Sequence, residues 1–263
     1  MSRLASQVAL ITGGGGEIGG AIARLFAREG AAVAAADIDL DKARAVADGI
    51  STKGGKAVAL QLDVSDATSA LAAVRTCAAA FGKVTILVNV AAAVTPDGTA
   101  ETLPLEEWNR ALAVNLSGPF IMCKYAVPEI RKAGGGAIVN IASQLGHLGV
   151  PGRAPYCTSK AALLHLTRVL AMDHARDNIR VNSISPGFIL TERSSKRVGG
   201  KAKAAKANGR RHLLNRPGTV EEVAAAALYL ASGDASFVTA TDLLVDGGYV
   251  AFKGYVTPDG GFE

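Results

Sequence analysis

The segment VALITGGGGEIGGAIARLFAREG, residues 8–30, decides how this chain folds. Its first five residues are a short, largely apolar run that predicts a buried strand, and a run of glycines follows directly. Beyond the glycines, apolar side chains recur on one face of a predicted helix that Gly30 ends, and these are Ile18, Ile22, Leu25 and Phe26. A strand, a glycine loop and a helix N-terminus together form a seat for a pyrophosphate, because the glycines admit it to the backbone and the helix dipole attracts its charge.

The rest of the chain repeats the alternation of strand and helix. Strands are predicted over residues 32–36, 58–62, 85–90, 137–141, 179–184 and 243–245, and helices over residues 65–81, 106–114, 121–133 and 220–231, with a long helix from Tyr156. This alternation, over 263 residues that suit one hydrophobic core, predicts an α/β fold: a single-domain, doubly wound parallel sheet of the Rossmann type with helices on both faces. Ligands of such sheets bind at the carboxyl ends of the strands.

Polar or turn residues stand where several predicted strands end, namely Asp37, Asp63, Asn89, Ser143 and Pro186-Gly187. Asp37 is well placed to accept hydrogen bonds from the ribose hydroxyls of an adenine nucleotide. Its charge would repel a 2′-phosphate, and neither Gly16 nor Ile38 supplies a positive charge to offset this repulsion. Asp37 therefore predicts NAD rather than NADP, and the alternative is that it caps the next helix.

A serine, a tyrosine and a lysine suggest proton transfer at one of these strand ends. Tyr156 and Lys160 are four residues apart at the start of a helix, so both side chains project from one face. A phenol with a pKa near 10 is a poor acid–base group at neutral pH, and an ammonium one turn away favours the phenolate and lowers that pKa. Ser143 can hydrogen-bond the same substrate oxygen. Taken alone, the three residues also fit an unremarkable surface, so the other motifs decide between the two interpretations.

Composition narrows the class of protein. No run of about 18 apolar residues exists, so no membrane span is predicted, and the N-terminus lacks the zones of a signal peptide. Cys77, Cys123 and Cys157 are widely spaced, without a CxxC motif or a clustered histidine. They predict free thiols of a reducing cytoplasm and no metal site, and Cys157 is expected to be a packed thiol rather than a nucleophile.

The net charge of +5 comes from one segment. Residues 191–216 hold nine Lys or Arg and a single acid, Glu192, which leaves nineteen basic and twenty-two acidic residues in the rest of the chain. The basic character is therefore local, and this argues against a nucleic-acid-binding protein.

Together these features resemble the short-chain dehydrogenase/reductase family of the one-domain type, over nearly the whole chain from Leu4 to Gly248. The matching motifs occur in the family's order: Thr12-Gly13, Asp37, Asp63, Asn89, Asn115, Ser143, Tyr156-xxx-Lys160, Pro186-Gly187 and the closing stretch from residues 235–239 to Asp246-Gly247-Gly248. The resemblance implies an NAD(P)-dependent alcohol dehydrogenase or ketone reductase, with NAD favoured, that acts on a small secondary alcohol such as an anionic hydroxy acid or a polyol. Two alternatives remain: an NADPH-dependent 3-oxoacyl reductase, against which Asp37 argues, and a non-catalytic dinucleotide-binding sensor, which typically lacks the tyrosine or the lysine.

The resemblance also implies a role for each matching residue. Tyr156 is the general acid/base, Lys160 lowers its pKa and holds the nicotinamide ribose, Ser143 positions the substrate oxygen, and Asn115 holds a water of a proton relay. The residues implied to line the dinucleotide are Gly13, Gly16, Ile18, Gly19, Asp37, Ile38, Asp63, Val64, Asn89, Ala91, Tyr156, Lys160, Pro186, Gly187, Ile189 and Thr191.

The chain departs from the family pattern at two places. Glu17 stands at the second glycine of the usual TGxxxGxG loop, where a carboxylate facing the pyrophosphate would weaken cofactor binding, so we expect its side chain to turn outward. Residues 89–92 read NVAA where NNAG is usual, and Ala92 adds a methyl group near the cofactor. Neither change removes a catalytic group.

The substrate side is less defined. The resemblance makes residues 191–215 a variable substrate lid, whose cations suit either an anionic substrate or a solvated helix face. Arg153 is a candidate anion anchor or a structural ion pair, and Gln144, Phe188 and Val94 are further candidate wall residues. For His147 the alternatives are a role in orienting a polar substrate group and a loop histidine in water.

The family usually forms tetramers, so the resemblance implies a homotetramer. The helix over residues 158–175 carries apolar residues on more than one face, as assembly between helices requires. The tail, residues 249–263, holds several aromatic residues and is expected either to pack on the body of its own chain or to reach the site of a neighbouring subunit.

Overall fold

A computed structural model describes residues 2–196, 199–252, 254–257 and 261. Within these residues the core is a parallel seven-stranded sheet with the strand order β3-β2-β1-β4-β5-β6-β7. The strands are β1 (Val8–Thr12), β2 (Ala32–Asp37), β3 (Ala57–Gln61), β4 (Ile86–Asn89), β5 (Gly136–Ile141), β6 (Ile179–Pro186) and β7 (Asp242–Val245). The predicted Rossmann-type sheet is confirmed, and each predicted strand lies within two residues of its observed bounds.

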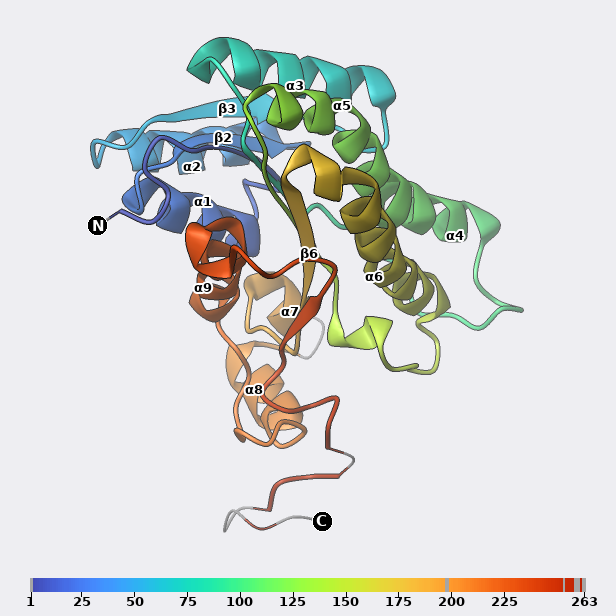
Figure 1. Cartoon of the computed structure of the whole chain (residues 1–263). Coiled ribbons are helices and arrows are strands. Elements are labelled where there is room, and N and C mark those ends of the chain that lie inside the picture. The colour runs from blue at the N-terminus through green and yellow to red at the C-terminus, as the bar shows by residue number, and fades with distance from the viewer. Residues whose placement is uncertain (1, 197–198, 253, 258–260, 262–263) are drawn as a thin grey trace.

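Helices cover both faces of the sheet, as predicted. They are α1 (Glu17–Arg28), α2 (Leu40–Ser51), α3 (Ala67–Phe81), α4 (Leu105–Leu112), α5 (Gly118–Lys132), α6 (Ala154–His174), α7 (Glu192–Lys196), α8 (Lys201–Gly209) and α9 (Val220–Ala231). Figure 1 shows α1, α2 and α9 on one side of the sheet and α3, α5 and α6 on the other. Two apolar clusters fill these layers, one between the sheet and each set of helices.

The strands are apolar on both faces because both faces are covered. Every residue of β1 and β4 is buried, and the two strands pair directly at the centre of the sheet. Between them they bring the glycine loop after Thr12 beside the polar end of β4 at Asn89. The chain reverses the order of its crossovers at this pair, and such a switch point is where ligands of doubly wound sheets bind.

The region between α4 and α5 differs from the prediction of two separate helices. A π-helical turn, Ala113–Ser117, joins them into one continuous run. A π turn inserts one extra residue into a helix, so the apolar pattern changes phase and resembles a break when read from sequence. Asn115, one of the predicted site residues, lies in this turn and is fully buried.

The described parts of the 191–215 segment and of the tail lie beyond the carboxyl edge of the sheet, and Figure 1 shows α7 below α9 and α8 below α7. The backbones of Arg210 and Val256 are joined by a hydrogen bond of 2.8 Å, and the Arg210 guanidinium lies 6.0 Å from the Tyr255 ring centroid. The described part of the tail therefore packs on its own chain, which is the first of the two alternatives for it.

Two further findings concern membrane-spanning helices and the cysteines. Among the described residues no helix is both long enough and apolar enough to cross a membrane. The three cysteines are free thiols, and burial raises the pKa of Cys77 and of Cys123 to about 12. These two thiols are therefore poor nucleophiles.

Candidate active site

The glycine loop has the geometry of a pyrophosphate seat. Gly13 has a φ of +64°, and a Cβ atom there would lie 2.9 Å from the backbone nitrogen of Ala91. A Cβ at Gly19 would clash with the carbonyl of Gly13, so the helix start can approach the loop only as glycine. Gly16 is the N-cap of α1 and offers no side-chain acceptor, which leaves first-turn amides of the helix available to an anion. The loop therefore fits a dinucleotide pyrophosphate.

Asp37 ends β2 beside this loop. Its carboxylate accepts hydrogen bonds from the backbone N–H of Gly15 at 3.0 Å and of Asp39 at 3.1 Å. The cap of α2 is Asp39, which accepts from the backbone N–H of Lys42 at 3.3 Å. The alternative that Asp37 serves as the helix cap is thus wrong, and its carboxylate stands half-buried at the mouth of the glycine loop.

Glu17 has a partner that the sequence did not indicate. Its carboxylate accepts a hydrogen bond of 2.8 Å from the backbone N–H of Glu192, the first residue of α7. The side chain is exposed and joins the start of α1 to the start of the 191–215 segment. A negative charge consequently stays at the mouth of the pyrophosphate seat while it holds the N-terminus of α7.

Replacement of Glu17 tests both effects. We expect Glu17→Gln, which keeps the acceptor for Glu192 but removes the charge, to tighten binding of NADH by about 2–5-fold, because exposed charge interactions contribute up to about 1 kcal/mol. Glu17→Gly removes charge and hydrogen bond together, so it should tighten binding similarly but also make the 191–215 segment more sensitive to limited proteolysis. Fluorescence titration with NADH and proteolysis of both variants measure the two effects, and weaker binding in both would contradict the electrostatic argument.

Tyr156 and Lys160 lie together at the start of α6, where Pro155 precedes them in the first turn. The Lys160 ammonium is 5.9 Å from the Tyr156 ring centroid and donates a 2.7 Å hydrogen bond to the carbonyl of Ile141. Lys160 is only 2% exposed, and burial, assisted by the charge of Arg193, lowers its pKa from 10.5 to about 8. Two groups able to exchange protons are thereby held side by side at the carboxyl edge of the sheet.

Ser143 and Asn115 complete the predicted catalytic group. Ser143 follows β5, is nearly buried, and its hydroxyl accepts a 3.1 Å hydrogen bond from the backbone N–H of Leu145. The Asn115 side chain accepts from the backbone N–H of Ala93 at 2.8 Å and donates to the Ser159 hydroxyl at 3.1 Å. Ser159 in turn donates to the carbonyl of Tyr156 at 2.9 Å. The π turn therefore supplies a side chain that fixes the loop after β4 to the first turn of α6.

A buried polar chain behind the site links β4, β5 and α6. The Asn89 amide donates to Asn140 at 2.8 Å, and the Asn140 amide donates to the Thr167 hydroxyl at 2.9 Å. Asn140 and Thr167 lie within apolar patterns and were not identified from the sequence. Each is paired in the interior, so this polar chain fixes the separation between the end of β4 at Asn89 and helix α6.

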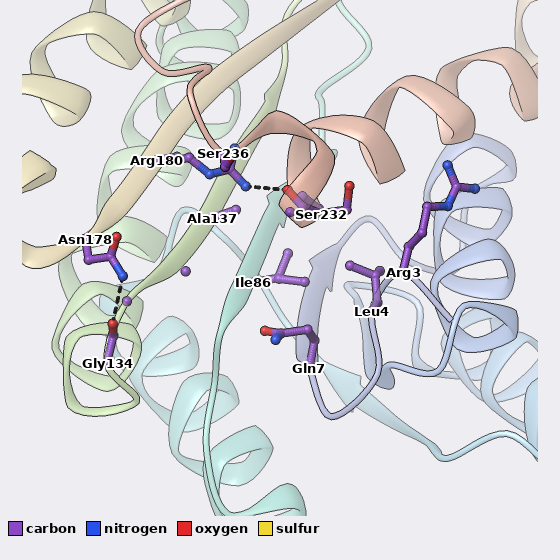
Figure 2. Close-up of a pocket in the computed structure, with 14 residues that line it drawn as sticks. Arg3, Leu4, Gln7, Ile86, Gly134, Ala137, Asn178, Arg180, Ser232 and Ser236 are labelled. Carbon is purple, nitrogen blue, oxygen red and sulfur yellow. Dashed lines mark hydrogen bonds between the residues drawn. The ribbon is translucent and has the colours of Figure 1, made fainter. Parts of the chain in front are cut away.

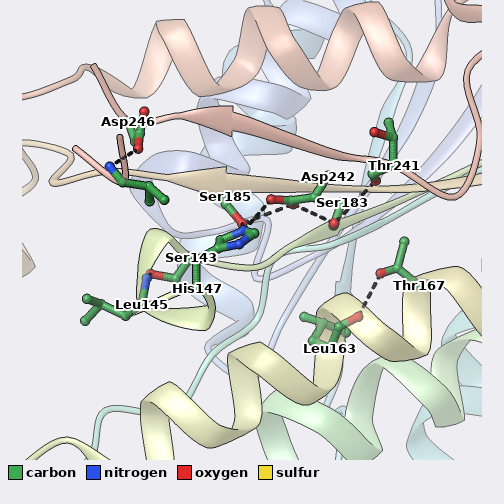
Figure 3. A network of polar contacts seen from close by, with 11 residues as sticks. Ser143, Leu145, His147, Leu163, Thr167, Ser183, Ser185, Thr241, Asp242 and Asp246 are labelled. Atoms are coloured by element: carbon green, nitrogen blue, oxygen red, sulfur yellow. Dashed lines mark hydrogen bonds and ion pairs between the residues drawn. The ribbon is translucent and has the colours of Figure 1, made fainter. Parts of the chain in front are cut away.

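His147 has a partner that neither of its alternatives included. Its Nε2 lies 2.7 Å from the Asp242 carboxylate, and Ser183 and Ser185 donate to the same carboxylate at 2.6 and 3.0 Å, as Figure 3 shows. Asp242 has only 8% of its side chain exposed. The histidine is exposed and is held by Asp242, so it ties the loop after Ser143 to the edge pair β6–β7, from a partner 95 residues away.

The loop after β6 is held from the 191–215 segment. A Cβ at Gly187 would lie 2.9 Å from Nε2 of His212, and this ring nitrogen accepts a 3.2 Å hydrogen bond from the backbone N–H of Phe188. His212 is 1% exposed and its other nitrogen bonds the carbonyl of Asn208 at 2.8 Å. The side chains of the predicted cofactor residues Ile189 and Val64 are in the core clusters, so they can offer only backbone to a ligand.

The cations of the substrate side divide into two groups. Arg193 donates to the carbonyl of Ala92 at 3.4 Å, and Arg153 forms an ion pair of 3.1 Å with Asp97, as one of its alternatives proposed. Other cations of the segment, Lys201, Lys203, Lys206 and Arg211, are exposed. The basic segment is therefore a solvated surface along α8. Arg193 is its cation near Lys160 of α6, and Arg197 lies outside the described residues.

A cavity lies away from the candidate site. The cavity of Figure 2, about 330 Å³, is lined by residues at the amino ends of the strands, among them Gln7, Ile86 and Ala137. Arg180 there donates to the carbonyl of Ser232 at 2.9 Å, and Asn178 to that of Gly134 at 3.1 Å. This cavity is at the edge of the sheet opposite Ser143 and Tyr156, so it is not part of the candidate site.

Comparison with known proteins gives matches over nearly the full length. A family model described as enoyl-(acyl carrier protein) reductase matches residues 15–250. D-threitol dehydrogenase of Mycolicibacterium smegmatis is 40% identical over 249 residues, 94% of this chain and 94% of that protein. A 2,5-dichloro-2,5-cyclohexadiene-1,4-diol dehydrogenase of Sphingobium indicum is 37% identical over 94% of this chain and 98% of its own, and cyclohexanol dehydrogenase of Acinetobacter sp. is 37% identical over 95% and 97%.

Proposed function

The chain belongs to the short-chain dehydrogenase/reductase family and is an oxidoreductase that acts on alcohols with a nicotinamide cofactor; we propose that the cofactor is NAD, the substrate a secondary alcohol of the hydroxy-acid or polyol type, and Tyr156 the general acid/base. The observation that carries the proposal is the buried Lys160 ammonium 5.9 Å from the Tyr156 ring. The names of the relatives describe oxidation of a polyol, a cyclic diol and a cyclic alcohol, which supports an alcohol as the substrate class.

Four side chains of the protein share the work of the proposed reaction. When bound, NAD supplies the acceptor for the hydride of the alcohol carbon. Ser143 donates a hydrogen bond that positions the substrate oxygen, and Tyr156 takes the hydroxyl proton during oxidation or returns it during reduction. The Lys160 ammonium stabilises the phenolate by its charge, and Asn115 keeps the loop after β4 and the first turn of α6 in register.

The residues proposed to hold NAD fit it in two further ways. The glycine loop packs closely against Ala91 and the start of α1, which it can do only without a Cβ at Gly13 and Gly19, and this leaves backbone rather than side chains to face a pyrophosphate. The Asn89 Oδ1 is buried and has no hydrogen-bond partner within the described part of the chain, so it is available to a donor on the cofactor side of β4. Asp37 supports NAD over NADP, because its carboxylate at the loop mouth would meet the 2′-phosphate.

Asp37 provides a direct test of cofactor choice. We expect the wild type to prefer NAD to NADP in kcat/KM by at least about 100-fold, since repulsion between a partly buried carboxylate and a phosphate amounts to a few kcal/mol. Asp37→Ser should lower kcat/KM with NAD about tenfold and raise that with NADP. Initial rates with both cofactors give the ratio, and a wild-type preference for NADPH would support the 3-oxoacyl reductase alternative instead.

A spectrophotometric screen tests the activity itself. Purified protein with NAD and panels of secondary alcohols, polyols and hydroxy acids should form NADH, seen by its absorbance, with at least one substrate class. If cofactor binds and no alcohol or ketone in the panels reacts, the non-catalytic sensor becomes the better explanation.

We also propose a homotetramer in the cytoplasm. The free cysteines support a reducing compartment. Exposed apolar side chains on α6 and on the edge strand β7 support assembly, since Met172 is 68% exposed and Leu244 is 41% exposed. Sedimentation of the purified chain distinguishes a tetramer from a dimer or monomer.

A further inference from the structure

Unpaired polar atoms are concentrated at the carboxyl edge of the sheet. Within the described ranges, the buried side-chain atoms without a hydrogen-bond partner are Asn89 Oδ1, Thr95 Oγ1, Gln144 Oε1 and Arg153 Nε. Asn89 ends β4, and Thr95 lies in the loop that follows it. Gln144 comes directly after Ser143, and Arg153 lies three residues before Tyr156. An unpaired buried polar group costs about 1–3 kcal/mol, and native proteins keep few of them, so a cluster at one edge indicates a ligand that pairs them.

Three of these atoms belong to the substrate side. Asn89 is assigned above to the cofactor. The other three lie on the side of Ser143 and Tyr156: Gln144 follows Ser143, Arg153 precedes Tyr156 by three residues, and Thr95 is in the loop after β4. Thr95 is 3% exposed and Gln144 is 8% exposed, so water does not satisfy them at the surface. The backbone N–H of Gly98 donates to the carbonyl of Gly152 at 3.0 Å, which joins the loop of Thr95 to the loop of Arg153.

The position of Arg153 favours an anion. Its guanidinium carbon is 5.5 Å from the Tyr156 ring centroid, and one terminal nitrogen binds Asp97 at 3.1 Å. Asp97 is 60% exposed at its side chain and Arg153 only 21%, so the pair turns the carboxylate to solvent and keeps the guanidinium inside. The inner Nε–H is the donor left without a partner, and a guanidinium binds a carboxylate through such an N–H together with a neighbouring one.

The charges around Tyr156 and Lys160 also favour an anionic substrate. Arg153, Lys160 and Arg193 place three cations around Tyr156 and the loop after β4. Arg193 is close enough to contribute to the lowered pKa of Lys160, so these two cations repel each other. A substrate carboxylate near these cations offsets the repulsion, whereas an uncharged alcohol leaves it in place.

Thr95 and Gln144 add hydroxyl recognition. The Oε1 of Gln144 is an acceptor, so it requires a donor such as a hydroxyl, and the Thr95 hydroxyl can donate or accept. A substrate with hydroxyl groups beyond the reacting one supplies partners for both. A simple hydroxy acid pairs Arg153 but leaves these two atoms unpaired, and an uncharged polyol does the reverse.

We propose that the substrate is a polyhydroxylated carboxylic acid, of the aldonic-acid type, with its carboxylate on Arg153 and hydroxyls other than the reacting one on Thr95 and Gln144. This inference rests on the proposed dehydrogenase function and narrows its substrate class. Arg153, Thr95 and Gln144 act as specificity-determining residues, since they recognise parts of the substrate that do not react.

Matched substrate pairs test the carboxylate. Each aldonate of five or six carbons is compared with the alditol of the same stereochemistry, for example D-gluconate with D-glucitol, in NAD-linked oxidation. We expect the best aldonate to exceed its alditol in kcat/KM by at least about tenfold, and Arg153→Gln to reduce that advantage by about 10–100-fold through KM, because a hydrogen bond to a charged group is worth 1.5–3 kcal/mol. The kcat/KM of the alditol in Arg153→Gln measures any effect of the lost charge on Tyr156 itself, so the role of Arg153 in recognition is read from the ratio of aldonate to alditol.

Controls separate this role from folding and from general charge. Lys206→Gln removes an exposed cation of α8 and should leave the aldonate preference unchanged, whereas a loss equal to that of Arg153→Gln would assign the effect to the net charge of the segment. Unchanged NADH affinity and melting temperature in Arg153→Gln show that the variant is folded. Thr95→Val, which keeps the shape, should lower the preference for an aldonate over 3-hydroxybutyrate.

The outcomes distinguish the two levels of the proposal. Oxidation of alditols or simple alcohols with no acid favoured overturns the polyhydroxylated acid while the dehydrogenase function stands. No oxidation of any alcohol in either set, with cofactor bound, means that the dehydrogenase function has failed. Titration of aldonates into the NADH complex of Tyr156→Phe adds a readout without turnover, and equal affinity for acid and alditol there also contradicts the role of Arg153.

Discussion

Tyr156→Phe is expected to lower kcat by about 10³–10⁴-fold, the contribution of a positioned general acid–base group. The change removes one oxygen and leaves the ring that lies under Arg153 and beside Lys160. Binding of NADH should therefore stay within about threefold of the wild-type value, because the glycine loop and Asp37 are untouched. Initial rates with the best alcohol and fluorescence titration with NADH provide the two measurements.

Tyr125→Phe is the matched control for this prediction. Tyr125 lies on α5, packed on the apolar cluster on that side of the sheet, and takes no part in the site. It should keep the rate within about twofold. A Tyr156→Phe variant with a near-normal rate would remove the proposed proton carrier, whereas loss of NADH binding as well would indicate a folding defect and not a chemical one.

The sequence predicted the sheet well because its pattern is local. Each strand is a short apolar run, and each following loop carries residues whose chemistry reveals its position, as Asp37 and Ser143 do. The proximity of Tyr156 and Lys160 was likewise predictable, because four residues along a helix bring two side chains to one face. The structure agrees with these predictions where only neighbours along the chain matter.

Contacts between distant residues could not be predicted in this way. Glu17 and Glu192 are 175 residues apart, and His147 and Asp242 are 95 apart, so neither pair belongs to a repeating pattern. The π turn around Asn115 was also missed, since one inserted residue only shifts the phase of an apolar helix. Thr95 Oγ1 and Gln144 Oε1 are buried without a hydrogen-bond partner because of what surrounds them in three dimensions. No property of a threonine or a glutamine in the sequence indicates this.

Lys160→Met is expected to have opposite effects on activity and stability. At 5.9 Å from the Tyr156 ring centroid, the ammonium stabilises a phenolate by about 3 kcal/mol at an effective dielectric constant of about 20. Loss of this charge should lower kcat/KM by about 100-fold or more. Lys132→Met, which removes an exposed ammonium at the end of α5, is the control and should leave the rate unchanged.

The effect of Lys160 on stability follows from its lowered pKa. The folded protein holds the proton with a pKa of about 8 and the unfolded chain with one near 10.5, so below pH 8 the buried charge destabilises the fold by on the order of 3 kcal/mol. Lys160→Met removes this cost but also the hydrogen bond to Ile141, worth about 1 kcal/mol. At pH 7 the variant should therefore unfold at a higher urea concentration than the wild type.

The advantage of the methionine must fade as the pH rises. Between pH 8 and 10.5 the unfolded wild type binds a proton that the folded form has released, so the stability of the wild type increases with pH while that of Lys160→Met lacks this contribution. Urea unfolding of both proteins at pH 7 and pH 10 gives the difference at each pH. A difference that is the same at both values would mean that Lys160 is not a desolvated cation, and it would weaken the electrostatic basis of the proton transfer assigned to Tyr156.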